Sequence, residues 1–213
     1  MIEAQLTVKH WIAVFGLFLA IVCASIQPLE FASYSLHQIG TVFMLMILFY
    51  VQYKVGLTFA SFLAYLVFLL IHILGAHYLY SYVPYNDWIQ FFWNFDLNKS
   101  MGWTRNMYDR VVHFAYGLLL YPFFYRVFQV CLPSLSAKVV FILVVQFVMA
   151  SSVFYEWIEW WIALGLSPES AENYNGQQGD IWDAHQDMLI ATLGAILTGL
   201  LLFFRQPRTS LKT

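Results

Sequence analysis

Six long runs of apolar residues, separated by short polar stretches, organise the chain of 213 residues. An α-helix needs about 20 apolar residues to cross the hydrocarbon core of a bilayer, and each run comes close to that length. The pattern therefore predicts an all-α fold, a polytopic membrane helix bundle with about six transmembrane helices. We expect these helices over residues 8–26, 35–53, 55–80, 110–132, 137–166 and 183–204.

The composition is typical of an integral membrane protein. Hydrophobic residues make up 61% of the chain and charged residues only 10%, whereas about 25% of the residues in an average soluble domain are charged. We therefore predict a single integral membrane domain over residues 1–213, with membrane lipid as its partner. A net charge of -2 provides no basic patch, which excludes nucleic acid as a partner. The long connection over residues 81–109 is rich in Tyr, Trp and Phe, as expected of a segment at the membrane interface.

The basic residues predict which end of the bundle faces the cytoplasm. Numbering the six helices in order places seven of the ten Lys and Arg residues at one end, where Glu3 is the one acid. By the positive-inside rule, this end and both chain termini are cytoplasmic, and the other acidic residues gather at the outer end. The seven basic residues are Lys9, Lys54, Arg126, Lys138, Arg205, Arg208 and Lys212.

Four of the predicted helices carry ionisable residues at the same depth, near their outer ends. Spacings of three or four residues place the acidic pairs, and an Asp with a His, on one face of their helices. Charge beside hydrocarbon is costly, so residues kept there usually serve a site. The residues are Asp109, Arg110 and His113; Glu156 and Glu159; Asp183 and Asp187; and His72 and His77.

The charge at this depth predicts a bound cation or proton. Five carboxylates face Arg110 as the only fixed positive charge, and such a cluster cannot stay both ionised and dry. Protons, protonated histidines, a cationic ligand or a divalent metal ion can compensate it. Oxygen ligands suit magnesium, calcium or manganese, and added histidines admit zinc or iron. The predicted metal ligands are Glu156, Glu159, Asp183 and Asp187, with His72 and His77 as further candidates.

The same residues predict catalytic roles. His113, oriented by Asp109, has the chemistry of a general acid or base. Glu156 is placed to hold a metal or to polarise water, and Arg110 to neutralise an anionic group such as a phosphate.

Each group also has a structural interpretation. Asp183 and Asp187 suit the positive end of a helix dipole, and Asp109 can form an interfacial ion pair with Arg110. His72 and His77 can be hydrogen-bonded core residues. Glu156 and Glu159 are harder to explain in this way, because they lie about two turns inside the last apolar residues of their helix.

Three motifs carry a family resemblance. They are Tyr108-Asp109-Arg110 followed by His113-Phe114, then Tyr155-Glu156-x-x-Glu159-Trp160-Trp161, then Trp182-Asp183-x-x-x-Asp187-Met188. Together they resemble the bacterial inner-membrane proteins of unknown function typified by YjdF, and more distantly the VanZ-like membrane family. Glu159 and Asp187 stand where the VanZ-like pattern has the amides Gln and Asn, so this site is more acidic. The resemblance implies the bacterial inner (plasma) membrane as location and supplies no mechanism.

Three classes of function fit these observations. The first is a metal-dependent or acid-base enzyme that acts on a lipid-linked or envelope substrate near the periplasmic face. The second is a transporter or sensor that binds a cation or solute, although no two-half repeat is visible in the sequence. The third is an envelope scaffold in which the polar cluster fixes how the helices pack.

Overall fold

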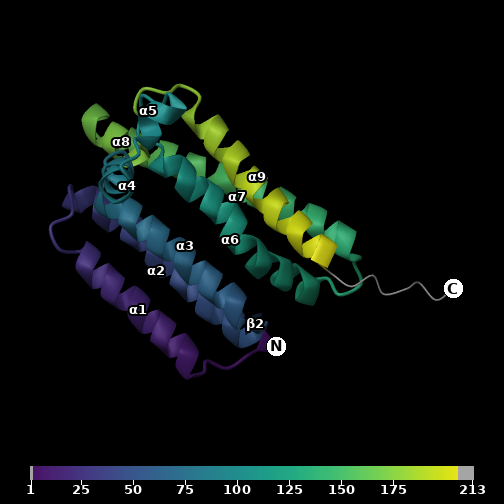
Figure 1. The fold of residues 1–213 in the computed structure, drawn as a ribbon. Coiled ribbons are helices and arrows are strands. Elements are labelled where there is room, and N and C mark those ends of the chain that lie inside the picture. The colour runs from purple at the N-terminus through teal and green to yellow at the C-terminus, as the bar shows by residue number, and fades with distance from the viewer. Residues whose placement is uncertain (1, 206–213) are drawn as a thin grey trace.

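A computed structural model describes residues 2–205, except for the side chains of residues 169, 173 and 205. Long helices run side by side as a bundle, with three short helices at one end (Figure 1). The helices are α1 (Val8–Ala24), α2 (Phe31–Lys54), α3 (Phe59–His77), α4 (Tyr85–Trp93), α5 (Leu97–Met101), α6 (Tyr108–Cys131), α7 (Ala137–Leu164), α8 (Pro168–Asn175) and α9 (Asp183–Arg205).

The predicted membrane helix bundle is confirmed. Helices α2, α3, α6, α7 and α9 are long and apolar enough to cross a membrane. Helix α1 is shorter, with 17 residues. At a rise of about 1.5 Å per residue it spans roughly 26 Å, a few ångströms less than a hydrocarbon core of about 30 Å.

Helix α2 begins at Phe31, four residues before its predicted start, and both boundaries of α3 differ from the prediction for local reasons. Helix α3 begins after residue 58 because β2 (Leu57–Thr58) pairs antiparallel with β1 (Ile2–Glu3), with Ile2 opposite Thr58. The Thr58 hydroxyl then caps the helix by accepting from Ser61 N at 3.1 Å. Helix α3 ends at His77. It does not continue to residue 80, because the backbones of Leu79 and Tyr80 adopt positive φ angles of 52° and 53°.

Helix α6 is the central element of the bundle. It packs against α3 on one side and against α7 and α9 on the other, while α3 also packs against α1 and α2. One apolar core therefore joins α1, α2, α3 and α6, and a second joins α6, α7 and α9. The second core is built partly from small residues, including Ala191 and Ala195.

Glycines allow α6 and α9 to approach each other at backbone distance. A Cβ atom on Gly117 would collide with the Ala191 carbonyl oxygen, and one on Gly194 with the Phe114 carbonyl oxygen. Small residues serve this purpose in membrane helix pairs because they let backbones approach closely. The Thr198 hydroxyl adds a hydrogen bond of 2.7 Å to the carbonyl of residue 118. This contact fixes the register of the two helices and brings their first turns together.

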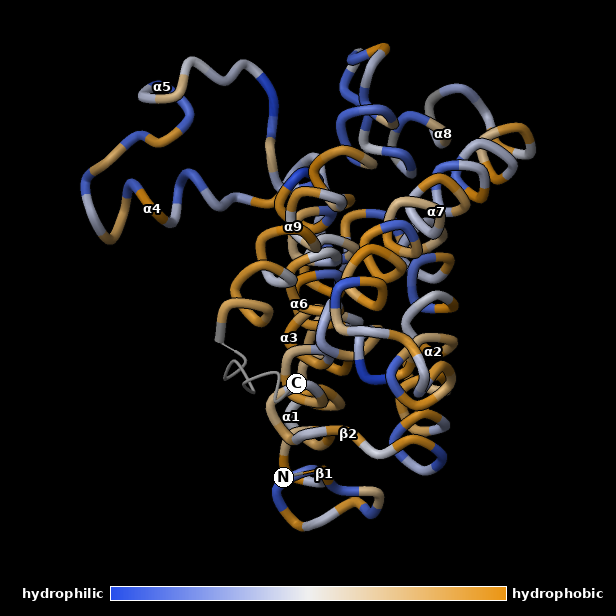
Figure 2. Tube along the Cα trace, turned by 90° about the vertical axis from the view of Figure 1, so that its right-hand side faces the viewer, coloured by the Kyte–Doolittle hydropathy of each residue, from blue (hydrophilic) through white to orange (hydrophobic). Residues whose placement is uncertain are grey.

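The two ends of the bundle differ in character. The N-terminus and the last turn of α9 lie at one end, and α4, α5 and α8 lie at the other (Figure 1). Figure 2 shows hydrophobic residues along the long helices and hydrophilic residues gathered around α8. Lys9, Lys54, Arg126 and Lys138 belong to turns at the end that holds the N-terminus. The cytoplasmic orientation of that end stays a prediction, and Arg208 and Lys212 lie outside the described residues.

The close approach of α6 and α9 makes a prediction about stability. Gly117→Ala should destabilise the protein by about 1–3 kcal/mol, because the added methyl group meets backbone that cannot move aside. Gly16→Ala is the matched control, since a Cβ atom on Gly16 has no atom within 4 Å and Ala is a better helix former. Thermal unfolding in detergent should show a lower midpoint for the first variant only. Equal midpoints for both variants would contradict the backbone contact.

Candidate functional site

The candidate site lies where the first turns of α6 and α9 meet. The spacing of Asp183 and Asp187 places both carboxylates on the face of α9 that is turned toward α6. Both are buried, as are Asp109, Arg110 and His113 on α6. The backbone contact farther along the same two helices therefore sets the distances within the site.

Arg110 is the centre of an ion-pair network. Its Nη2 lies 2.7 Å from Asp183 Oδ1 and 3.2 Å from Asp180 Oδ2, and its Nη1 donates to the Asp183 carbonyl at 3.1 Å. Nη1 also forms an ion pair with Asp187. The expected pair between Asp109 and Arg110 is not among the ion pairs of the described residues, because neighbouring residues on a helix point about 100° apart. Arg110 points to α9 instead.

A second guanidinium, from Arg105, completes this network. Arg105 Nη1 lies 2.7 Å from Asp183 Oδ1 and 3.3 Å from Asp180 Oδ2. The helical pattern of the sequence gives no indication of Arg105, because this residue lies in the loop between α5 and α6. One feature of the sequence did point to Arg105: it lies five residues before Arg110, just ahead of the helix that carries the site. Asp183 is therefore shared between two arginines.

Asp180 lies at the aqueous edge of the network. It accepts a hydrogen bond of 2.9 Å from the backbone N–H of Trp182. This bond, together with Arg110 and Arg105, holds the pKa of the Asp180 carboxyl below its usual range. Asp180 therefore stays ionised at neutral pH and links the turn before α9 to Arg105 and Arg110.

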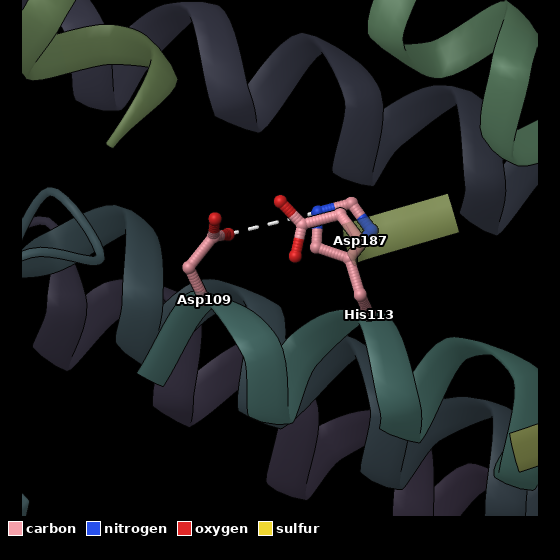
Figure 3. Close-up of side chains that lie close together, drawn as sticks. All are labelled: Asp109, His113 and Asp187. Carbon is pink, nitrogen blue, oxygen red and sulfur yellow. Dashed lines mark ion pairs between the residues drawn. The ribbon is translucent and has the colours of Figure 1, made fainter. Parts of the chain in front are cut away.

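Asp109, His113 and Asp187 bring their side chains together beside the ion pairs (Figure 3). One ligand atom from each lies within 4.8 Å of the other two, and His113 Nε2 lies 3.7 Å from Asp109 Oδ1. Their exposed fractions are 7%, 8% and 2%. Two carboxylates and one imidazole in this arrangement could hold a divalent cation, and we call them the acid-His group.

Helix α7 brings its glutamates to the same place. Tyr116 of α6 and Ser151 of α7 are joined by a hydrogen bond of 2.7 Å between their hydroxyls, which docks the two helices one turn away. Glu156 is close enough to Asp187 for their charges to interact, and Glu159 interacts in the same way with Asp109. Glu156 Oε1 is buried and has no hydrogen-bond partner. The glutamates of α7 therefore lie near the carboxylates of α6 and α9, but of the predicted metal ligands only Asp187 belongs to the acid-His group.

The two histidines of α3 are used elsewhere. His72 Nε2 lies 3.3 Å from the carbonyl oxygen of His37, which can only accept, so Nε2 carries the hydrogen. Nδ1 then accepts from the Tyr80 hydroxyl at 2.6 Å. Burial raises the pKa of Tyr80 well above its ordinary value, which keeps this hydroxyl protonated. His77 Nδ1 donates to the Ala24 carbonyl at 2.8 Å, at the end of α1. Neither histidine joins the acid-His group.

The segment after α7 packs beside the site. Tyr174 of α8 stacks on His37 of α2, with ring centroids 4.6 Å apart and planes 7° apart. Arg105 Nη2 donates to the Gly176 carbonyl at 3.1 Å. Gly176 has a φ of 69°, a left-handed conformation that favours glycine after the last turn of a helix. The turn that follows α8 therefore lies beside the acid-His group, since a Cβ atom on Gly176 would be 4.0 Å from Asp109 Oδ2.

The site carries more negative than positive charge. The network and its surroundings hold six carboxylates, those of Asp109, Glu156, Glu159, Asp180, Asp183 and Asp187, against the guanidinium groups of Arg105 and Arg110. The arginines compensate the aspartates at the start of α9. The carboxylates deeper in the bundle are left for a proton or a cation.

Two comparisons with known proteins found membrane proteins. A family model described as predicted membrane protein (DUF2238) matches residues 9–208. The inner membrane protein YjdF of Escherichia coli (strain K12) is 34% identical over 129 residues, which cover 61% of this chain and 57% of that relative. The chain thus spans little more than half the length of this relative. No solved structure matches. The YjdF-type resemblance is confirmed, and the VanZ-like resemblance stays a prediction.

The ion-pair network predicts a large effect of removing its central cation. Arg110→Met should cost about 3–5 kcal/mol, because it leaves buried carboxylates without a partner. Adding Asp187→Asn to that variant should recover part of the loss, since one uncompensated charge is removed. Lys99→Met is the control, and Lys99 is exposed on α5. Thermal unfolding in detergent measures all three variants, and a midpoint for Arg110→Met equal to that of Lys99→Met would refute the network.

Proposed function

Because the chain belongs to the predicted membrane protein family DUF2238 and buries a charged cluster, we propose that it is an enzyme of the bacterial inner membrane. Its chemistry is metal-assisted acid-base catalysis on a lipid-linked or envelope substrate. The observation that carries this proposal is the convergence of Asp109, His113 and Asp187 within 4.8 Å.

The acid-His group has the donors of a catalytic metal site. One imidazole nitrogen and two carboxylate oxygens suit zinc, manganese or ferrous iron better than magnesium or calcium, which prefer oxygen alone. Three protein ligands leave a coordination position open for water or substrate, as catalytic sites require. Arg110, which pairs with Asp187, is then a positioning residue that orients this carboxylate.

Glu156 would supply the acid-base chemistry beside the metal. Glu156 Oε1 is buried without a hydrogen-bond partner, so it is available to accept a proton from a bound water. His113 and Asp109, predicted as an acid-base pair, would serve in this proposal as metal ligands instead. Arg110 has its donors engaged by aspartates. This arrangement favours a positioning role over its predicted role in phosphate binding.

The position of the site points to a substrate at the membrane surface. The acid-His group lies within membrane-spanning helices, near the end that carries α4, α5 and α8. This end is the predicted periplasmic face, because the basic residues gather at the other one. A lipid-linked substrate presents its polar head at that depth.

The excess of carboxylates also supports a second function, cation binding in a transporter or sensor. The deeper carboxylates would exchange protons for the cation, as acidic residues do within membrane transporters. The same residues would take part, so the two functions are separated by what happens after the cation binds.

Metal analysis tests the proposal. Protein purified in detergent and equilibrated with zinc or manganese should hold one metal ion per chain, measured by elemental mass spectrometry. Asp109→Asn and His113→Gln should lose it, because each removes one ligand atom from the group. Asp87→Asn, an exposed change in α4, is the matched control and should keep it. A metal-free wild type that is correctly folded rules out metal-assisted chemistry.

Transport is measured separately, in proteoliposomes that enclose a metal-sensitive dye. Metal binding without uptake supports the enzyme. Uptake by the wild type that is absent in Asp109→Asn replaces the enzyme with the transporter.

A further inference from the structure

Helices α4 and α5 form an arm that extends sideways from the bundle (Figure 2). Neither helix contains a buried residue. A segment with this many aromatic residues and no place in the protein core needs another apolar surface to cover it.

Helix α4 has two chemically different faces. Spacings of three and four residues align Asn86, Gln90 and Asn94 on one side and aromatic residues on the other. The exposed fractions of Phe91, Phe92 and Trp93 are 83%, 69% and 72%. The aromatic face comprises Trp88, Phe91 and Phe92. Trp93, seven residues after Asn86, lies toward the polar side, and Phe95 follows the helix.

The polar face of α4 is occupied by α5. Asn86 Oδ1 accepts from the backbone N–H of Asn98 at 3.0 Å, and Asn86 Nδ2 donates to Asp96 Oδ1 at 3.2 Å. Asp96 also caps α5 by accepting from Lys99 N at 2.9 Å. Helix α5 therefore lies on the polar side, and the aromatic side points away from it.

The arm is fixed in height relative to the membrane-spanning helices. The Tyr85 hydroxyl donates to Asn98 Oδ1 at 2.7 Å and accepts from the backbone N–H of Met107 at 3.0 Å. Asn106 Nδ2 donates to the Val83 carbonyl at 2.9 Å. These bonds join the two ends of the arm where α3 has ended and α6 is about to begin. The arm therefore lies at the level where these helices leave the hydrocarbon.

Exposed tryptophans on another element mark the same level. Trp157, Trp160 and Trp161 lie in the last two turns of α7 and are each more than half exposed. Figure 1 shows that the end of α7 and α4 belong to the same end of the bundle. Tryptophan is enriched at the boundary between hydrocarbon and headgroups.

We propose that the aromatic face of α4 inserts into the interface of the same bilayer that the bundle crosses. Amphipathic helices with Trp and Phe on one face lie in this plane, with the apolar face buried at the boundary of headgroups and acyl chains. The arm carries Asp87, Asp96 and Lys99 as its charged residues, so its contact with lipid is apolar rather than a recognition of anionic headgroups. The partner is the lipid surface, and the inference is independent of the proposed enzyme.

Site-directed spin labelling tests the inference. The background carries Cys23→Ala and Cys131→Ala, and single labels are placed with Phe92→Cys on the aromatic face and Gln90→Cys on the polar face. Phe91→Cys gives a second aromatic position. The full chain is reconstituted in vesicles of phosphatidylethanolamine and phosphatidylglycerol. Collisions of each label with oxygen, which concentrates in lipid, are compared with collisions with a water-soluble nickel chelate.

The ratio of oxygen to nickel collisions should be severalfold higher at Phe92→Cys and Phe91→Cys than at Gln90→Cys. Equal ratios dominated by nickel would place the arm in water and overturn the inference. Spectral broadening at Phe92→Cys that disappears on dilution with unlabelled protein would also overturn it, because the aromatic face would then contact a second copy of the chain.

Discussion

The backbone contact between α6 and α9 is the constraint on which the rest of the site depends. Gly117 and Gly194 remove the side chains that would separate the two helices. His113 lies one turn before Gly117, and Asp187 lies one turn before Ala191 on the facing helix. The contact therefore determines how closely the acidic residues of α9 approach the basic and imidazole groups of α6. Larger residues at the crossing would move Arg110 away from Asp183 and Asp187 and leave buried charges without an ion-pair partner.

The site is divided by depth into two electrostatic environments. At the aqueous edge, two arginines share the carboxylates of Asp180 and Asp183. Deeper in the bundle, Asp109, His113 and Glu156 have no arginine of their own among the described ion pairs, and Asp187 stands between the two environments through Arg110. The outer part is suited to holding helices together, whereas the inner part retains groups that can change their protonation or bind a cation.

The sequence predicted the helices and the grouping of their polar residues, because apolar length and helical spacing are local properties. It could place Asp109 with His113 on one face, and Asp183 with Asp187 on another. It could not show that Arg110 turns away from Asp109 toward α9, since that depends on how two distant helices cross. Arg105 was overlooked because a loop has no periodicity that would aim its side chain. The role of His72 was equally hidden, because it depends on Tyr80, whose left-handed backbone ends α3.

The short first helix has a consequence for the lipid around the protein. With 17 residues, α1 is shorter than the 24 residues of α6 and the 28 of α7. A helix shorter than the hydrocarbon thickness is accommodated by local thinning of the bilayer or by flanking side chains that reach to the headgroups. Lys9, in the first turn of α1, has the length to do so. The bilayer around the protein is therefore expected to be thinner beside α1 than beside α7. The stability of the protein should then depend on the acyl-chain length of the surrounding lipid.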